Sequence, residues 1–237
     1  MKKQLDVVGL TQAIVAMNTI NPPGNELKCA AFLADILESS DFDTQLVKFA
    51  DGRANLIARK GHVDGVKPIC LTGHIDTVPL GHEPWTQDPF NGEIIDGKLY
   101  GRGSCDMKGG VAAIIVAAIN IGKNLLNTGG VTLIFTCGEE TGCEGAKALC
   151  KMPEVLGEAS AIIVGEPTSN KPLIGHKGAL WLHAACKGVT AHGSTPELGV
   201  NAIYKASRSI SQIENFGFDV PPHEVMGNPS INVGRMR

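Results

Sequence analysis

Residues 99–110 read LYGRGSCDMKGG, and residues 111–121 follow directly as VAAIIVAAINI. The first stretch holds a single acid, Asp106, among four glycines. The second is apolar over nearly all of its length, which is typical of a helix buried in a protein core. Asp106 is therefore expected at the start of a buried helix, where the helix dipole favours a carboxylate. Taken alone, this position is also typical of an aspartate that caps the helix.

Apolar segments that alternate with helical patterns lie on both sides of this stretch. Residues 68–72, 131–137 and 159–164 read as short apolar strands, as expected for strands that are covered on both faces. Further strands are predicted over 42–49 and 55–60. Helices are predicted over 7–17, 27–37, 111–121 and 144–151, and the turn NPPG at 21–24 stops the helix over 7–17. This alternation predicts an α/β fold with a mostly parallel sheet and helices on both faces.

The pattern changes in the last third of the chain. Residues 93–100 still read as a hairpin, with Asp96 and Gly97 in a turn that needs positive φ. Beyond Pro172, we predict a long strand over 178–187, a helix over 200–213 and a last strand over 230–234. We interpret residues 1–174 as one domain and 175–237 as the first part of a smaller α+β domain.

Composition excludes several classes of function. A formal net charge of −3 and a pI near 6.2 give no electrostatic basis for nucleic-acid binding. The longest uncharged stretches have the length of a soluble protein's helix or strand, so we expect no membrane span. The N-terminus begins like a signal peptide, but Asp6 and Gln12 interrupt its apolar stretch, which argues against one. Seven cysteines without a C-x-x-C pair predict reduced, mostly buried thiols and a cytoplasmic location.

Three predicted strands end in acids or imidazole. In chain order the side chains are His74 with Asp76, Glu139 with Glu140, and Glu166. Ligands of open parallel sheets bind at the carboxyl ends of the strands, so these groups are expected to meet Asp106 at one rim. Crowded carboxylates repel one another, and a divalent cation is their natural counter-charge. One imidazole with several carboxylates suits zinc, cobalt or manganese better than calcium.

The spacing within each pair predicts separate roles. His74 and Asp76 face the same side of an extended segment, so Asp76 can accept a hydrogen bond from the ring nitrogen that binds no metal. Adjacent Glu139 and Glu140 diverge, which lets one bind metal while the other acts as a general base. Each group taken singly has an alternative interpretation without metal. His74 and Asp76 fit a core histidine with its partner, Glu139 and Glu140 fit a solvated helix start, and Glu166 fits an acid in a loop. Their conjunction at strand and helix ends favours a metal site.

Several segments together resemble the M20 metallopeptidase family. They are GHIDTVP, YGRGSCDMKGG, TCGEETG, VGEPT, HKG and GVTAHGSTPELGVNAI, and the resemblance runs from Asn21 to the last residue. Within the family, the chain is most similar to the branch of acetylornithine deacetylase and succinyl-diaminopimelate desuccinylase. The resemblance implies a zinc-exopeptidase-like α/β catalytic domain followed by a lid and dimerisation domain.

The resemblance also implies an activity. It points to a metal-dependent hydrolase of amino-acid biosynthesis, a deacetylase or desuccinylase, that cleaves a small N-acyl amino acid into a carboxylate and a free amine. A homodimer and a cofactor of two divalent ions, Zn²⁺ or Co²⁺, are implied with it. The alternatives are a dipeptidase or carboxypeptidase of the same family and, from another class, a catalytically inactive metal-binding remnant.

By the same resemblance, four side chains hold the two ions. His74, Asp106 and Glu166 would bind the first ion, and Asp106 would bridge it to a second ion that Glu140 also binds. The family places a further histidine ligand of the second ion near the end of a longer chain, beyond the residues present here. We therefore expect an incomplete second metal site. The family also suggests a cis peptide bond between Asp106 and Met107.

Three residues receive roles in the reaction. Glu139 would be the general base, Asp76 would orient His74, and His192 would reach into the active site of the partner subunit and stabilise the oxyanion. Because the family continues where this sequence stops, we expect residues 1–174 to lack the last segment of the catalytic domain. The chain is then either a fragment or a truncated gene product.

Overall fold

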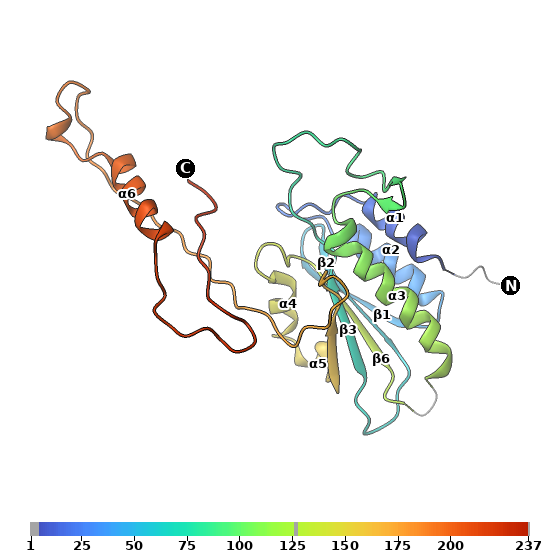
Figure 1. Cartoon of the computed structure of the whole chain (residues 1–237). Helices are drawn as coiled ribbons and strands as arrows, with labels where there is room; N and C mark the ends of the chain where they lie inside the picture. The colour runs from blue at the N-terminus through green and yellow to red at the C-terminus, as the bar shows by residue number, and fades with distance from the viewer. Residues whose placement is uncertain (1–4, 126–127, 237) are drawn as a thin grey trace. The chain divides into compact units, whose positions relative to one another are not determined.

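The computed structural model describes residues 5–125 and 128–236. The chain divides into two compact units, Met1–Asn170 and Lys171–Arg237 (Figure 1). The division lies close to residues 174–175, where the sequence pattern changes.

The first unit is built on a five-stranded sheet. Its strands, in spatial order, are β1 (Asp43–Ala50), β2 (Arg53–Lys60), β6 (Val131–Thr136), β3 (Ile69–His74) and β7 (Ala161–Val164). Strands β6, β3 and β7 pair in parallel, whereas β2 is antiparallel to both of its neighbours. Four of the five strands therefore run in the same direction. The predicted α/β fold with a mostly parallel sheet is confirmed.

Helices cover both faces of this sheet (Figure 1). They are α1 (Val7–Val15), α2 (Leu27–Glu38) and α3 (Gly109–Ile121) on one face, and α4 (Glu144–Leu149) and α5 (Pro153–Leu156) on the other. Alternation along β2 shows how the two cores arise, because successive strand residues point to opposite faces. Leu56 and Ala58 join the larger core under the first three helices, while Ile57 between them joins Leu149 in a smaller core.

Helix α3 is only half buried, contrary to the prediction of a helix buried on nearly all sides. Val111 and Ile115 on its inner face are buried, whereas Ile121 is 53% exposed. By length and composition alone, Ser104–Ile121 is long and apolar enough to cross a membrane, so the expectation of no membrane span stays a prediction. The core helix of an α/β domain passes the same test, and α3 packs against β3 and β6.

Strand β7 also differs from its prediction. Its sequence predicts a buried strand, yet Ile162, Ile163 and Val164 are 65%, 55% and 56% exposed. It is the edge strand of the sheet, and its side chains join neither of the two cores. An apolar strand sequence indicates that the strand is stable when both of its faces are covered, but the covering layers are formed by other segments of the chain.

Two smaller predictions have opposite outcomes. The hairpin is confirmed as β4 (Ile94–Ile95) and β5 (Lys98–Leu99), with φ of 49° at Asp96 and 73° at Gly97. The thiols are not mostly buried. All seven are free; Cys29, Cys70 and Cys137 are buried, and Cys105, Cys143, Cys150 and Cys186 are exposed.

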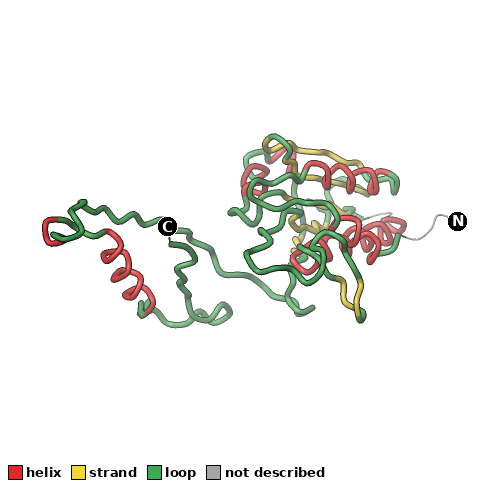
Figure 2. The backbone as a smooth tube through the Cα atoms, turned by 90° about the horizontal axis from the view of Figure 1, so that it is seen from above, coloured by secondary structure: helices red, strands yellow, loops and turns green. Residues whose placement is uncertain are grey.

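The second unit is mostly loop around one long helix, α6 (Ala202–Glu214), as Figure 2 shows. The predicted helix is confirmed, and the side chain of Asn201 caps it by accepting from two backbone N–H groups. The strands predicted over 178–187 and 230–234 are loop instead. A strand needs a neighbour for its backbone groups, and the described residues of this unit offer only two isolated bridges.

Candidate metal centre

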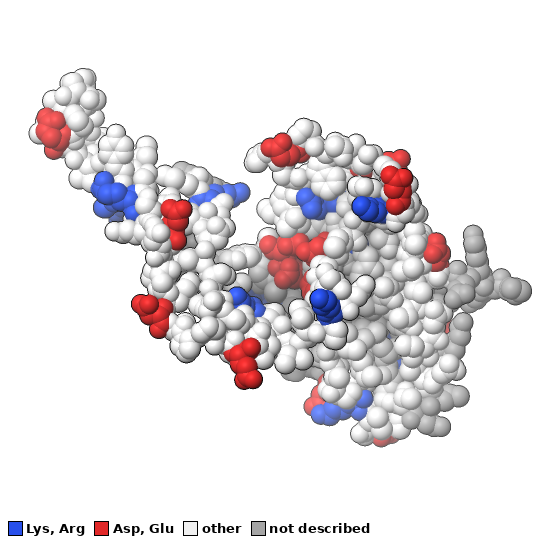
Figure 3. Space-filling model, viewed as in Figure 1, with Lys and Arg blue, Asp and Glu red and all other residues white. Residues whose placement is uncertain are grey.

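The predicted metal ligands lie at one rim of the sheet. Strand β3 ends at His74, Glu140 follows β6, and Glu166 follows β7. Because these strands are parallel, their carboxyl ends meet at the same edge. Asp106 lies in the short helical segment η1 (Ser104–Lys108) that leads into α3. Acidic side chains gather over these strand ends in Figure 3.

The distances between the ligands suit a divalent cation. The Nε2 atom of His74 lies 3.0 Å from Oδ1 of Asp106 and 3.7 Å from Oε1 of Glu166. One ligand atom each from His74, Asp106 and Glu140 lie within 4.8 Å of one another. His74 is buried, whereas the side chains of Asp106 and Glu166 are 56% and 38% exposed. An imidazole nitrogen and carboxylate oxygens thus converge at an accessible point, which is a donor set for a divalent metal ion.

The loop before α3 brings Asp106 to this point. The peptide bond between Asp106 and Met107 is cis, as the family resemblance suggests, and Asp106 has non-helical φ and ψ of −118° and 102°. Met107 is buried, and its sulfur lies 3.2 Å from the backbone nitrogen of His74. A Cβ at Gly110 would lie 2.4 Å from the carbonyl oxygen of Gly165, so a glycine is required where the first turn of α3 approaches the residue before Glu166.

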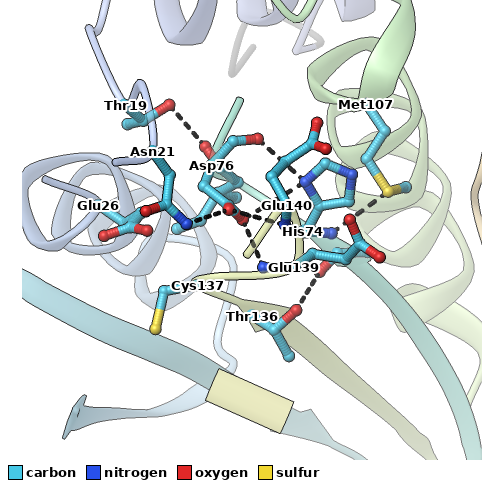
Figure 4. Close-up of polar contacts among 12 residues, drawn as sticks. Thr19, Asn21, Glu26, His74, Asp76, Met107, Thr136, Cys137, Glu139 and Glu140 are labelled. Atoms are coloured by element: carbon cyan, nitrogen blue, oxygen red, sulfur yellow. Dashed lines mark hydrogen bonds and ion pairs between the residues drawn. The ribbon is translucent and has the colours of Figure 1, made fainter. Parts of the chain in front are cut away.

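The ring of His74 is oriented by Asp76 through the main chain. Its Nδ1 atom lies 2.9 Å from the main-chain oxygen of Asp76 and 3.5 Å from the carboxylate oxygen Oδ1 (Figure 4). An Nδ1–H that donates to this carbonyl leaves the Nε2 lone pair facing the acids. The sequence predicts the carboxylate of Asp76 as the acceptor, and the main-chain oxygen is the nearer group.

The carboxylate of Asp76 holds the turn that carries the two glutamates. It accepts from the backbone nitrogens of Glu139 and Glu140 at 3.0 and 3.1 Å, and from Nδ2 of Asn21 at 2.9 Å (Figure 4). We call residues 138–141 the acid turn. Sequence reasoning missed Asn21, because it assigned this residue only to the turn after α1. The one local signal was an amide side chain beside two prolines.

The two glutamates of the acid turn differ in position. Glu140 belongs to the group that surrounds the candidate metal position together with His74 and Asp106, and Glu139 does not. Oε1 of Glu139 instead accepts from the thiol of Cys143 at 3.6 Å. Adjacent side chains therefore diverge, as the sequence predicts.

Two cations near Asp106 do not neutralise the acids. Lys108 is buried, and its Nζ donates to the main-chain oxygens of Ile14 and Met17 at 2.8 and 2.7 Å. The guanidinium of Arg102 donates to the main-chain oxygen of Pro79 at 3.0 Å, and its central carbon lies 5.0 Å from the ring centroid of Trp85. Among the described residues, neither forms an ion pair with the acids of the rim.

The pKa values of the site follow from burial and like charge. Burial raises the pKa of Glu140 to about 7, and neighbouring carboxylates add to this effect against the opposing charge of His74. The pKa of Glu166 is raised for the same reasons. Burial would lower the pKa of His74, but the nearby carboxylate of Asp76 and the charges of Glu166 and Asp106 raise it to about 9. A bound divalent cation would balance this excess of negative charge.

His192 is the remaining predicted site residue. It is exposed in the second unit, where its Nδ1 lies 2.7 Å from Oγ of Ser194. The group of His74, Asp106 and Glu140 is built entirely from the first unit.

Comparison with known proteins gives consistent matches. The family model described as Peptidase family M20/M25/M40 matches residues 70–229. A probable succinyl-diaminopimelate desuccinylase of Staphylococcus epidermidis is 40% identical over 200 residues, which are 84% of this chain and 48% of the relative. Succinyl-diaminopimelate desuccinylase of Wolbachia pipientis is 35% identical over 225 residues, covering 91% and 56%. The chain thus spans about half the length of these curated relatives.

A solved structure agrees with the fold. The M20 family metallo-carboxypeptidase from Sulfolobus solfataricus matches with a TM-score of 0.68 at 20% identity, over 88% of this chain and 50% of that one. At this identity, the likeness concerns the fold alone.

Proposed function

The chain belongs to peptidase family M20/M25/M40, and from that premise we propose that it forms the metal-binding part of an amidohydrolase. The reaction is cleavage of an N-acyl amino acid into a carboxylate and a free amine. The observation that carries the proposal is the convergence of His74, Asp106 and Glu140 within 4.8 Å, with Glu166 beside His74. The names of the two relatives favour succinyl-diaminopimelate as substrate over acetylornithine.

The residues of the rim fit a pair of divalent cations, zinc or cobalt. His74, Asp106 and Glu166 would hold one ion, and Asp106 and Glu140 would hold the other. When bound, such ions polarise the scissile carbonyl and lower the pKa of the attacking water. The bound cations would also stabilise the ionised acids of the rim, because they offset the repulsion between the carboxylates.

Proton transfer is assigned to Glu139. Glu139 and Glu166 both lie outside the group of His74, Asp106 and Glu140, but only Glu166 lies within ion-pair distance of His74 among the described residues. The carboxylate of Glu139 is therefore free to take a proton from the attacking water and to pass it to the leaving nitrogen. The backbone nitrogen of Glu139 is fixed by Asp76, which supports this geometry. We further propose a homodimer in which His192 of the partner subunit stabilises the oxyanion.

The two parts of the chain then have different tasks. Residues 1–174 form the catalytic domain, and residues 175–237 belong to the lid and dimerisation domain. The free cysteines support a cytoplasmic location, since no disulfide joins them.

Metal titration followed by substrate assays tests the proposal. Calorimetric titration of the metal-stripped chain with Zn²⁺ or Co²⁺ should show about one tightly bound ion, with His74, Asp106 and Glu166 as its ligands. His74→Ala or Asp106→Ala should abolish that binding. Hydrolysis should be faster with succinyl-diaminopimelate than with acetylornithine or a dipeptide. Absence of metal binding, or a preference for the dipeptide, would contradict the proposal.

A further inference from the structure

Asn21 connects the segment after α1 to the candidate metal centre. It is 2% exposed, and its Nδ2 donates to Oδ2 of Asp76 at 2.9 Å and to Oγ1 of Thr141 at 2.8 Å. Its backbone nitrogen donates to the carbonyl oxygen of Thr77 at 2.8 Å. The same short segment is therefore fixed to the chain just after β3 and to the acid turn.

The side-chain amide of Asn21 acts on the acid turn through two contacts. One is direct, through Thr141, and the other passes through Asp76, whose carboxylate accepts from the backbone nitrogens of Glu139 and Glu140. The main-chain oxygen of Asp76 also accepts from the ring of His74. Asp76 thus links a predicted metal ligand to the predicted base, and Asn21 holds Asp76.

The contact continues into a buried ion pair. The hydroxyl of Thr141 donates to Oε2 of Glu144 at 2.9 Å, and the same oxygen accepts from Nη1 of Arg53 at 3.1 Å. The other nitrogens of Arg53 bind both carboxylate oxygens of Glu26, at 2.8 and 3.0 Å. Glu26 is fully buried, so this end of the network is rigidly placed.

We propose that Asn21 is a positioning residue for the acid turn, because its amide fixes Asp76 and Thr141 relative to each other. The side-chain amide nitrogen of asparagine offers two hydrogens in one plane, one for each acceptor. The hydroxyl hydrogen of Thr141 is already donated to Glu144, so Thr141 has only an acceptor to offer Asn21. The inference rests on the proposed function, in which Glu139 and Glu140 are base and ligand.

The test compares two variants of the same segment in the full chain. Asn21→Leu removes both donors at similar volume. Thr19→Val is the matched control, since the buried hydroxyl of Thr19 donates to the main-chain oxygen of Ile75 at 2.7 Å and does not contact the carboxylate of Asp76. The two readouts are amide hydrogen exchange at Glu139 and Glu140 without metal, and calorimetric affinity for Zn²⁺.

In Asn21→Leu, we expect the two amides to exchange at least about tenfold faster, because the acid turn opens locally. The affinity for Zn²⁺ should fall by up to about 10-fold, because Asn21 acts on the ligands only through Asp76, the direct partner of His74. Thr19→Val should change neither readout. If Asn21→Leu matches the wild-type protein in both, or if Thr19→Val shows the same losses, the inference is overturned.

A second pair covers the case in which Asn21→Leu does not fold. Thr141→Val should speed exchange at the acid turn, and Thr141→Ser, which keeps the hydroxyl, should restore the wild-type rate. Equal rates in these two variants would overturn the inference. Faster exchange in Asn21→Leu together with no Zn²⁺ binding by the wild-type chain would support the role of Asn21 and refute the proposed function instead.

Discussion

His74 donates from Nδ1 to the main-chain oxygen of Asp76 at 2.9 Å, while the carboxylate of the same residue lies 3.5 Å away. The carboxylate is therefore available to the backbone nitrogens of the acid turn. One aspartate orients the imidazole with its main chain and the two glutamates with its side chain. Any change that moves Asp76 is expected to disturb both at once.

The first prediction separates the two glutamates. Glu140→Gln should weaken binding of the second Zn²⁺ ion, because Glu140 is proposed to hold that ion together with Asp106. Glu139→Gln should leave the affinity for Zn²⁺ within about twofold and reduce turnover of succinyl-diaminopimelate about 10²–10⁴-fold, the usual loss for a positioned base. Calorimetry and a steady-state assay measure the two effects. A collapse of metal affinity in Glu139→Gln would show that the assigned roles are reversed.

The rim of the candidate site was predictable from sequence because each ligand lies next to the end of a strand or the start of a helix. His74, Asp106 and Glu166 occupy such positions. Asn21 could not be found in this way, since its contacts join it to residues 55 and 120 positions away. Such a contact depends on how the loops pack, which local patterns do not encode.

The same distinction applies to the fold. The mostly parallel direction of the strands follows from the alternation of strands and helices, which is a local pattern. The exposure of β7 and the loop over 178–187 were not predictable, because burial and pairing depend on a second segment. The apolar sequence of a strand indicates that the strand needs a neighbouring segment to cover it, but it does not show whether that segment is present.

The second prediction concerns pH in the metal-free protein. The folded-state pKa of Glu140 is raised from 4.5 to about 7, so its contribution to stability is present below 4.5 and is lost as pH rises through 7. The pKa of His74 is raised from 6.5 to about 9, so its contribution is present below 6.5 and is lost as pH rises through 9. Both effects have the same sign.

Urea unfolding of the metal-free chain at about pH 5, 7 and 9 should therefore show falling stability. Zn²⁺ balances the acids and displaces the proton of His74, so its stabilising effect should increase over the same range. A stability that stays constant or rises with pH would contradict this account of the rim.

The third prediction concerns the buried pair of Arg53 and Glu26, whose atoms approach to 2.8 Å. Arg53→Met alone should cost about 3–5 kcal/mol in the free energy of unfolding, because it leaves the fully buried Glu26 without its partner. The double variant Arg53→Met with Glu26→Leu should recover most of this loss. Urea unfolding of the single and double variants completes the cycle.

The exposed pair of Lys67 and Glu158 serves as the control. These side chains are 57% and 75% exposed at a separation of 3.0 Å. Lys67→Met should cost less than about 1 kcal/mol, because solvent screens the pair. If Arg53→Met costs no more than Lys67→Met, the buried pair does not anchor the acid turn.

The last prediction concerns the open edge of the sheet. Among the described residues, strand β7 pairs with β3 on one side only, and its side chains Ile162, Ile163 and Val164 are more than half exposed. An unpaired edge with an apolar surface promotes association between chains, so the 237-residue protein should self-associate and bind a hydrophobic dye. Ile163→Lys should reduce both effects in light scattering and dye titration, because a charge at an edge strand opposes pairing. Ile121→Lys, at an exposed position of α3, is the matched control and should leave the association through β7 unchanged. A monodisperse wild-type monomer without dye binding would show that this edge is covered in solution.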